Sequence, residues 1–243
     1  MRPVKVLQLS LDPAMRGWMN EGKSYIPPVG IGEVMRAGGV GKVVASNNTA
    51  FAVGDHVAGG FGVQEYCMAD EAGIKRMGLA KIDLRMGTLS QWLNALGMPG
   101  MTAYFGLLET GQPKAGETVV VSGAAGAVGQ TVGQVAKIKG CRVVGIAGGP
   151  DKCAFVVKEL GFDACIDYKA EGKSALKDGL KQPCPNGGDV YFDNVGGEIL
   201  DTVLTRINRR ARIVDGLNTF PETLNMLFEG KNFGKLVLKV ADS

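Results

Sequence analysis

Hydrophobic residues follow two different spacings along the chain, and the spacing changes near residue 100. Before that point they form short alternating runs separated by glycines, a pattern typical of strands that bury one face. The predicted strands are 4–11, 41–46, 55–58 and 63–69. Short strands with frequent glycine turns favour a small barrel or a curved sheet.

From Met101 onward, short apolar runs alternate with longer segments whose apolar residues recur at helical spacing. The predicted helices are 102–109, 127–139, 151–160, 172–181 and 198–207. The predicted strands are 117–122, 142–147, 164–167, 189–193 and 211–214. This alternation predicts an α/β domain with a parallel sheet. A doubly wound sheet needs one more helix and strand after Val214, which residues 221–229 and 235–240 could supply.

Composition indicates a globular protein and removes several functional classes. Hydrophobic residues make up 45% and charged residues 21%, which argues against disorder. The formal net charge of +3 is too small to indicate a nucleic-acid partner, and no apolar run is long enough to predict a membrane span. The chain has a single histidine, His56, and its five cysteines form no CxxC pair, so we expect no bound metal. We expect a cytoplasmic protein with reduced cysteines.

Glycine contributes 37 of the 243 residues and is concentrated in one motif. Residues 117–129, ETVVVSGAAGAVG, are an apolar strand that turns through glycines into a helix. Such glycines let the backbone approach a pyrophosphate, and the free amides at the helix start face its negative charge. The spacing is GxxGxxG, because Ala124 stands where GxGxxG has its second glycine. The motif predicts a dinucleotide site; a purely structural glycine turn is the alternative.

The end of the second predicted strand indicates which dinucleotide is bound. An acidic residue at this place normally binds a free ribose 2′-hydroxyl, but here the strand ends in Ala147-Gly148-Gly149-Pro150. Lys152 follows at the start of the next helix, where a cation could pair with a 2′-phosphate. NADP(H) is therefore favoured over NAD(H), and a solvated lysine beside Asp151 is the alternative interpretation.

Two further groups receive structural interpretations. Cys153 and Cys165 are interpreted as core or helix-surface thiols. A set of arginines is interpreted as complementing the carboxyl end of a helix, rather than as a nucleic-acid patch, because no aromatic residues accompany it. Its members are Arg206, Arg209, Arg210 and Arg212.

Several segments resemble the zinc-independent medium-chain dehydrogenases/reductases. They are LSLDP at 9–13, LGMPGMTAY at 96–104, GAAGAVG at 123–129, KGCRVVG at 139–145, YFDNVGG at 191–197 and GKNFGK at 230–235. Because these segments are spread from residue 9 to residue 235, the resemblance covers nearly the whole chain. The most similar branch is that of the leukotriene B4 dehydrogenases and prostaglandin reductases, with bacterial curcumin reductase and plant alkenal reductase relatives.

This resemblance implies a GroES-like substrate domain over 1–99, a Rossmann NADP-binding domain over 100–214, and a segment 215–243 that returns to the substrate domain. It implies a homodimer that uses NADPH to reduce the carbon–carbon double bond of α,β-unsaturated ketones or aldehydes, by hydride transfer to the β-carbon. The implied cofactor-binding residues are Gly126, Ala127, Val128 and Gly129 at the pyrophosphate, Lys152 and Tyr168 at the 2′-phosphate, and Asn194 and Asn232 nearer the nicotinamide.

The chain also departs from the family pattern. Relatives have additional strands before the match to Val4, and after the match to Val214 they continue with a helix that bears the usual catalytic tyrosine and with a sixth strand. Both domains are therefore expected to be incomplete in this chain, and no catalytic residue is assigned. Ala14 stands where many relatives have a tyrosine that faces the substrate, and Tyr25 is a candidate for the substrate cleft, with simple packing as the alternative.

Three other functions stay open beside enone reduction. The first is a quinone reductase of the same superfamily, which would use the same cofactor site. The second is a non-catalytic NADPH-binding protein, which the departure after Val214 motivates. The third is a chain that only scaffolds a dimer through the edge of its parallel sheet.

Overall fold

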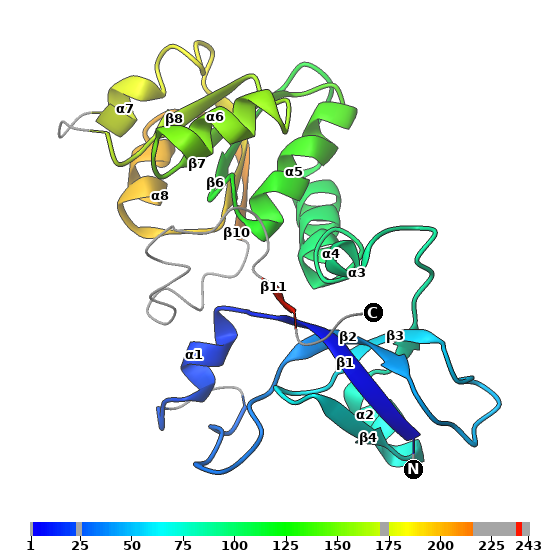
Figure 1. Ribbon diagram of the computed structural model, residues 1–243. Helices are drawn as coiled ribbons and strands as arrows, with labels where there is room; N and C mark the ends of the chain where they lie inside the picture. The colour runs from blue at the N-terminus through cyan, green and yellow to red at the C-terminus, as the bar shows by residue number, and fades with distance from the viewer. Residues whose placement is uncertain (1, 23–25, 171–174, 216–236, 240–243) are drawn as a thin grey trace. The chain divides into compact units, whose positions relative to one another are not determined.

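The structure is a computed structural model of the 243-residue chain (Figure 1), and it describes residues 2–22, 26–170, 175–215 and 237–239. The chain divides into two compact units. The first contains the chain up to Gly97 together with the last described strand, and the second begins at Met98. None of the helices in these described ranges has the length and apolar character that a membrane crossing requires.

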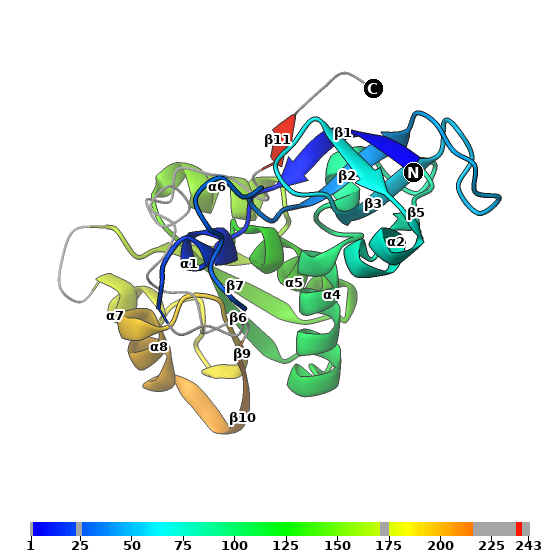
Figure 2. The same ribbon diagram turned by 90° about the horizontal axis from the view of Figure 1, so that it is seen from below.

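An antiparallel six-stranded sheet forms the first unit (Figure 2). Its strands are β1 (Arg2–Ser10), β2 (Gly38–Val43), β3 (His56–Gly60), β4 (Tyr66–Ala69), β5 (Ala80–Lys81) and β11 (Val237–Lys239). β1 pairs with β2, β4 and β11, and the sheet continues from β2 to β3 and β5. Val4 and Val6 of β1 are buried in the core of this unit, because alternate residues of a strand point to the same face. The register of β1 against β2 shifts between Val6 and Gln8, so Leu9 joins the same core although it is three residues beyond Val6.

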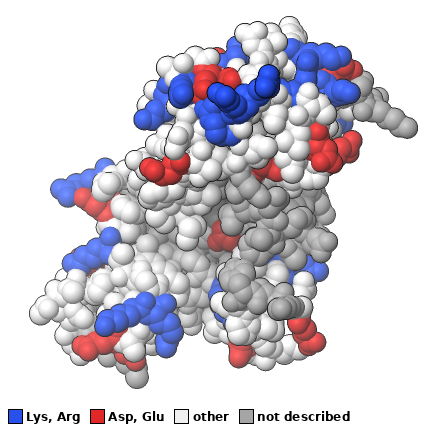
Figure 3. Space-filling model, turned by 180° about the vertical axis from the view of Figure 1, so that it is seen from behind, with Lys and Arg blue, Asp and Glu red and all other residues white. Residues whose placement is uncertain are grey.

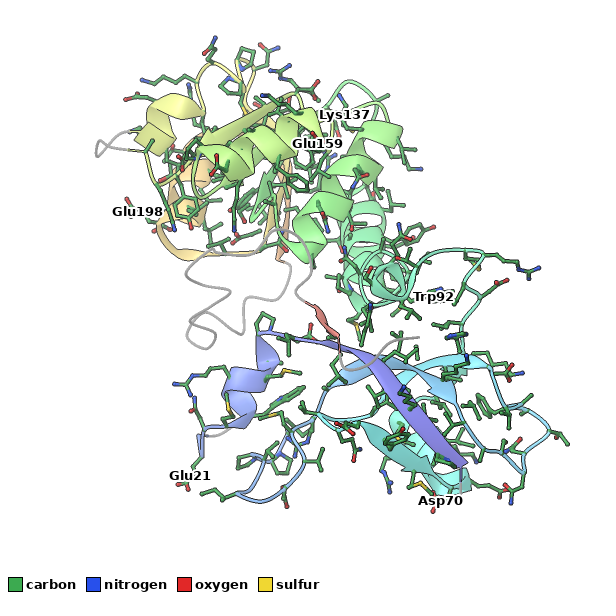
Figure 4. All side chains as sticks on the ribbon, viewed as in Figure 1. Glu21, Asp70, Trp92, Lys137, Glu159 and Glu198 are labelled. Atoms are coloured by element: carbon green, nitrogen blue, oxygen red, sulfur yellow. The ribbon has the colours of Figure 1, made fainter. Side chains whose placement is uncertain are left out.

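The helices of the first unit are α1 (Ala14–Trp18), α2 (Glu71–Met77) and α3 (Leu89–Trp92), and none of them was predicted. The ends of α2 have clear sequence signals. The carboxylate of Asp70, labelled in Figure 4, caps the helix by accepting a hydrogen bond of 2.6 Å from Gly73 N. Gly78 ends the helix in the left-handed conformation, with φ of 59°.

A parallel five-stranded sheet forms the second unit, in the order β10-β9-β6-β7-β8. Its strands are β6 (Thr118–Ser122), β7 (Arg142–Ala147), β8 (Ala164–Asp167), β9 (Gly188–Asp193) and β10 (Ile207–Asp215). Its helices are α4 (Met98–Phe105), α5 (Ala127–Ile138), α6 (Pro150–Lys158), α7 (Ala175–Gly179) and α8 (Gly197–Leu204), and a π-helix, η1 (Gly106–Gly111), follows α4. The predicted α/β fold with a parallel sheet is confirmed.

Helices cover both faces of this sheet, with α7 and α8 on one side and α4 and α5 on the other (Figure 1). The central strand shows the division most clearly, because every residue of β6 is buried. Val119 and Val121 pack with α4, α5 and α6, whereas Val120 packs with α7 and α8. A strand buried on both faces reads as a continuous apolar run, which is why the sequence predicted it well.

Several predicted boundaries are wrong. The predicted helix 102–109 is two elements, α4 and η1, and α8 ends at Leu204, so that Ile207 already belongs to β10. The predicted strand 235–240 contains β11, which pairs with β1 in the antiparallel sheet and does not extend the parallel one. The predicted helix 221–229 lies outside the described residues.

The prediction for the arginine group is wrong for three of its four members, whereas Arg206 does follow the carboxyl end of α8, where its backbone amide donates to Val203 O at 2.8 Å. Arg209, Arg210 and Arg212 lie on β10 and not at the end of a helix. The guanidinium of Arg212 forms an ion pair with Glu117 and donates hydrogen bonds to two backbone oxygens, Gly111 O at 2.8 Å and Gln112 O at 3.1 Å. It therefore fastens β10 to η1 and to the start of β6. On the face shown in Figure 3, basic side chains lie in small groups beside acidic ones.

Candidate dinucleotide site

The carboxyl ends of the parallel strands all lie at one edge of the sheet. The order in which strands are added to the sheet reverses at β6. From β6 the chain adds β7 and then β8 on one side, and it next crosses to place β9 on the other side of β6. In open α/β sheets, ligands bind in the crevice where the strand order reverses. The loops that follow β6 and β9 lie at this point.

The glycine-rich loop after β6 has a compact conformation that glycine makes possible. Gly123 is in the left-handed region, with φ of 57°, and Gly126 N donates to Gly123 O at 2.8 Å. A β-carbon added at Gly129 would lie 2.3 Å from Gly123 O, so only glycine fits there. The first turn of α5 therefore packs directly against the loop, as a helix that approaches a diphosphate requires.

The start of α5 offers backbone amides without side-chain competition. Gly126 is the N-cap residue and has no side chain with which to cap the helix. An α-helix leaves the amides of its first turn, here those of Ala127, Val128 and Gly129, without intrahelical acceptors. Together with the positive end of the helix dipole, they favour an anionic ligand.

A buried carboxylate joins the end of β6 to the turn after β9. Asp193 is 2% exposed, and its Oδ1 accepts hydrogen bonds of 2.8 Å from both Ser122 Oγ and Tyr191 Oη. The same oxygen also accepts from two backbone amides, Val195 N at 3.1 Å and Gly196 N at 3.0 Å. Burial raises the pKa of Tyr191, so that its hydroxyl stays protonated as a donor.

Asn194 is held beside the glycine-rich loop by this network. Its backbone amide donates to Ser122 Oγ at 2.8 Å, and its side-chain Nδ2 donates to Ser122 O at 2.9 Å. A β-carbon at Gly123 would be 3.4 Å from Asn194 Cβ. Two predicted binding segments are therefore in contact, through residues Ser122 and Asn194 that are 72 positions apart in sequence.

Residues at the end of β8 hold the loop that follows β7. Asp167 Oδ1 accepts a hydrogen bond of 2.7 Å from Gly149 N, and Tyr168 N donates to Ala147 O at 3.2 Å. The ring of Tyr168 lies over Gly148, since a β-carbon there would be 2.9 Å from Tyr168 Oη. As predicted, β7 ends without a carboxylate, and the carboxylate of Asp167, at the end of β8, accepts from two backbone amides, Gly149 N and Lys169 N.

Two lysines bring positive charge to this end of the sheet. Lys152 is half-buried in the first turn of α6, and its pKa is lowered by burial and, to a smaller extent, by the charge of Lys169. Lys169 directly follows Tyr168 and was not predicted; its place just beyond the third strand is the signal that could have identified it. Like charges gathered near a helix start favour an anionic ligand.

The structure brings together most of the predicted site residues at the carboxyl edge. Gly126, Ala127, Val128, Gly129 and Asn194 lie at the carboxyl ends of β6 and β9, and Lys152 and Tyr168 lie just beyond the ends of β7 and β8. Asn232 and Tyr25 lie outside the described residues, as does the segment that directly follows β10.

Two family models match the chain. Residues 3–77 match a model described as the N-terminal domain of oxidoreductase, and residues 127–226 match one described as zinc-binding dehydrogenase. Within the described ranges, no group of three or more histidine, cysteine, aspartate or glutamate side chains is arranged to hold a metal ion.

Bacterial and mammalian oxidoreductases are among the proteins similar to this chain. The chain is 49% identical over 210 residues to a putative NADP-dependent oxidoreductase of Bacillus subtilis, YfmJ, and 48% identical over 210 residues to the NADPH-dependent curcumin reductase of Escherichia coli. It is 42% identical over 210 residues to prostaglandin reductase 1 of Rattus norvegicus. Each match covers 86% of this chain but only 60%, 59% and 60% of the relative, respectively.

Solved structures of similar sequence share the fold. CurA from Vibrio vulnificus in complex with NADPH superposes with a TM-score of 0.84 at 36% identity, over 100% of this chain and 90% of that chain. A second CurA structure gives a TM-score of 0.76 at 44% identity, over 94% of this chain and 68% of that one.

Proposed function

The chain belongs to the zinc-independent medium-chain dehydrogenases/reductases, and from that premise we propose that it binds NADP(H) and reduces the carbon–carbon double bond of α,β-unsaturated ketones or aldehydes. The observation that carries the proposal is the glycine-rich loop packed against the start of α5, with Lys152 and Lys169 at the ends of the neighbouring strands. The names of relatives, the curcumin reductase of Escherichia coli and a 2-alkenal reductase of Nicotiana tabacum, support the substrate class.

In this proposal the residues of the second unit divide the cofactor between them. The amides of Ala127, Val128 and Gly129 hold the diphosphate, because they point out of the helix start without side-chain competition. Lys152 and Tyr168 bind the 2′-phosphate by charge and by a hydroxyl hydrogen bond. NADPH, when bound, supplies the hydride that the reduction needs.

Asn194 and Asn232 are proposed to lie along the cofactor nearer the nicotinamide. For Asn194 the support is its position: its Nδ2 is engaged by Ser122 O, so its carboxamide oxygen is the atom with which it would accept a hydrogen bond. The Asp193 network fixes this side chain before any ligand arrives, which reduces the entropic cost of binding.

Steady-state oxidation of NADPH tests the activity. We expect turnover with a 2-alkenal or with curcumin. The loss of NADPH absorbance measures the rate. Turnover of a benzoquinone in preference to either would favour a quinone reductase. Tight NADPH binding without any turnover would favour a non-catalytic NADPH-binding protein, and an absence of NADPH binding would refute all three.

The organisation of the molecule is also part of the proposal. We propose that 1–99 and 215–243 form the substrate domain, in which Tyr25 lines the cleft, and that 100–214 form the cofactor domain. The division of the chain after Gly97 and the pairing of β11 with β1 support this arrangement. We further propose a cytoplasmic homodimer, for which the native mass in solution is the direct test.

A further inference from the structure

Helix α6 lies directly over two neighbouring residues of β7 and β8. Gly145 and Cys165 are partners in the ladder between these strands. A β-carbon added at Gly145 would be 3.1 Å from Val156 Cγ1, which shows how closely α6 approaches the sheet there. Cys153 stands three residues before Val156, on the same face of α6 and one turn nearer its start. The fold thus directs Cys153 toward Cys165.

The two thiols are in contact as this geometry requires. Cys153 and Cys165 share a side-chain hydrogen bond, and both are half-buried at the margin of the core under α6. The other three cysteines, Cys67, Cys141 and Cys184, are buried singly, in different parts of the fold. Cys153 and Cys165 are therefore the one thiol pair among the five cysteines, all of which the structure describes.

The two members of the pair differ in reactivity. The hydrogen bond from Cys165 lowers the pKa of Cys153, and the backbone at Ala147 lowers it further, although burial and the charge of Asp167 act in the opposite direction. The pKa of Cys165 is raised, first by the same hydrogen bond and then by burial. Cys153 also lies at the start of α6, directly after Lys152, where the positive end of the helix dipole favours a thiolate, whereas Cys165 lies on β8. A thiolate is the reactive form of cysteine, so Cys153 is assigned as the nucleophile and Cys165 as the thiol that reacts with its product.

Burial disfavours the same chemistry at the remaining cysteines. It raises the pKa of Cys67 and Cys141, and it raises the pKa of Cys184 to about 11. A soluble oxidant is therefore expected to react first at Cys153.

We propose that Cys153 and Cys165 form a redox modification site, which a hydroperoxide converts into an intramolecular disulfide between α6 and β8. In the first step the Cys153 thiolate attacks one peroxide oxygen, the O–O bond breaks, and Cys153 sulfenic acid and hydroxide form. In the second step the Cys165 sulfur, having lost its proton to that hydroxide, attacks the Cys153 sulfur and expels a second hydroxide, which takes up the proton that Cys153 released on forming its thiolate and leaves as water. Two thiols and one hydrogen peroxide give one disulfide and two waters.

The site adjoins the proposed 2′-phosphate site without being part of it. Cys153 directly follows Lys152, and Cys165 stands three residues before Tyr168. Disulfide formation can be measured whether or not NADPH binds, so this inference can fail or succeed independently of the proposed function.

Stoichiometric hydrogen peroxide, added to the fully reduced chain, tests the inference. We expect the intact mass to fall by two hydrogen atoms, peptide mapping to join the peptides that contain Cys153 and Cys165, and dithiothreitol to reverse both changes. Oxidation that begins at Cys67, Cys141 or Cys184, or that leaves Cys165 as a free thiol in the wild-type chain, would overturn the proposal. This mapping needs no variant, so it does not depend on whether a substitution folds.

Serine variants separate the two roles. In Cys165→Ser the sulfenic acid on Cys153 has no partner and is expected to accumulate, where dimedone labels it. In Cys153→Ser, Cys165 is expected to react with hydrogen peroxide at least about tenfold more slowly than the wild-type pair does, because its pKa is raised and it lacks a nucleophilic neighbour. Cys184→Ser is the matched control and is expected to form the disulfide at the wild-type rate. Equal rates of reaction with hydrogen peroxide in all three variants would contradict the roles assigned to Cys153 and Cys165.

Discussion

Ser122 Oγ donates a hydrogen bond of 2.8 Å to Asp193 Oδ1, which joins the carboxyl ends of two parallel strands across 71 residues of sequence. Both side chains are fully or almost fully buried, so the bond is protected from competition by water. It places the turn with Asn194 against the glycine-rich loop. The candidate site is therefore assembled by the fold before any ligand binds.

Replacing Asp193 by alanine is expected to destabilise the second unit. The change leaves the Ser122 and Tyr191 hydroxyls and two backbone amides without their shared acceptor, at a cost of about 3 kcal/mol. Urea denaturation measures the change in the free energy of unfolding. Glu198→Ala, at an exposed position on α8 (Figure 4), is the control and is expected to change it by less than about 0.5 kcal/mol. Similar values for the two variants would contradict a structural role for the buried carboxylate.

Gly129→Ala is expected to weaken NADPH binding by at least about tenfold, because the new methyl group must displace the loop at Gly123 O. Isothermal titration calorimetry measures the dissociation constant. Gly22→Ala is a suitable control, since a β-carbon at Gly22 has no neighbour within 4 Å. If both variants bound NADPH as tightly as the wild type, the diphosphate would not lie at the start of α5.

Lys152→Ala is expected to lower the affinity for NADPH by about tenfold or more and to leave the affinity for NADH unchanged, because only NADPH carries the 2′-phosphate. Lys169→Ala is also expected to lower the affinity for NADPH, but by less, since Lys169 is the more exposed of the two lysines. Binding is followed by the fluorescence of the reduced nicotinamide. The control is Lys158→Ala, in the last turn of the same helix. Equal losses for NADPH and NADH in Lys152→Ala would assign Lys152 a structural role.

The ion pair between Arg212 and Glu117 predicts a dependence of stability on pH. The Arg212 guanidinium donates hydrogen bonds to the Glu117 carboxylate, and these lower the pKa of Glu117 below the ordinary value of 4.5. A carboxyl group with a lowered folded-state pKa stabilises the fold above its unfolded-state pKa, and this contribution is lost as the pH falls through the folded-state value. The stability that this pair contributes is therefore present at neutral pH, and it is lost in acid as the pH falls below the ordinary glutamate pKa of 4.5.

Arg212→Gln removes the pair and provides the measurement. It is expected to lower the free energy of unfolding by about 1 kcal/mol near neutral pH and by less in acid, where Glu117 is protonated in both proteins. Arg209→Gln, at an exposed position on the same strand, is the matched control and is expected to have little effect at either pH. A loss in Arg212→Gln that stayed constant with pH would show that the pair does not carry it.

The fold could be predicted where a single segment carries its own signal. Strands 142–147 and 164–167 have the predicted ends, because each is a short apolar run that ends at turn residues. The start of β10 could not be predicted, because Arg210 takes a left-handed conformation, with φ of 69°, within an irregular stretch of the ladder. Nothing in the local pattern distinguishes these residues from the end of a helix.

The same distinction holds for the candidate site. The glycine-rich loop is contiguous, so its chemistry was visible in the sequence. The bonds between Asn194 and Ser122, and the contact of Cys153 with Cys165, depend on which strands become neighbours. Strand order is a tertiary property, and for this reason the thiol pair was missed, whereas Lys152 could be predicted from its place directly after the end of the second strand.

Titration of the wild-type chain with NADPH and with NADH, in the same buffer, tests the central claim most directly. If the start of α5 holds a diphosphate and Lys152 a 2′-phosphate, NADPH binds at least about tenfold more tightly than NADH, and added salt reduces this preference. Equal affinity for the two nucleotides, or binding of neither, would contradict the account.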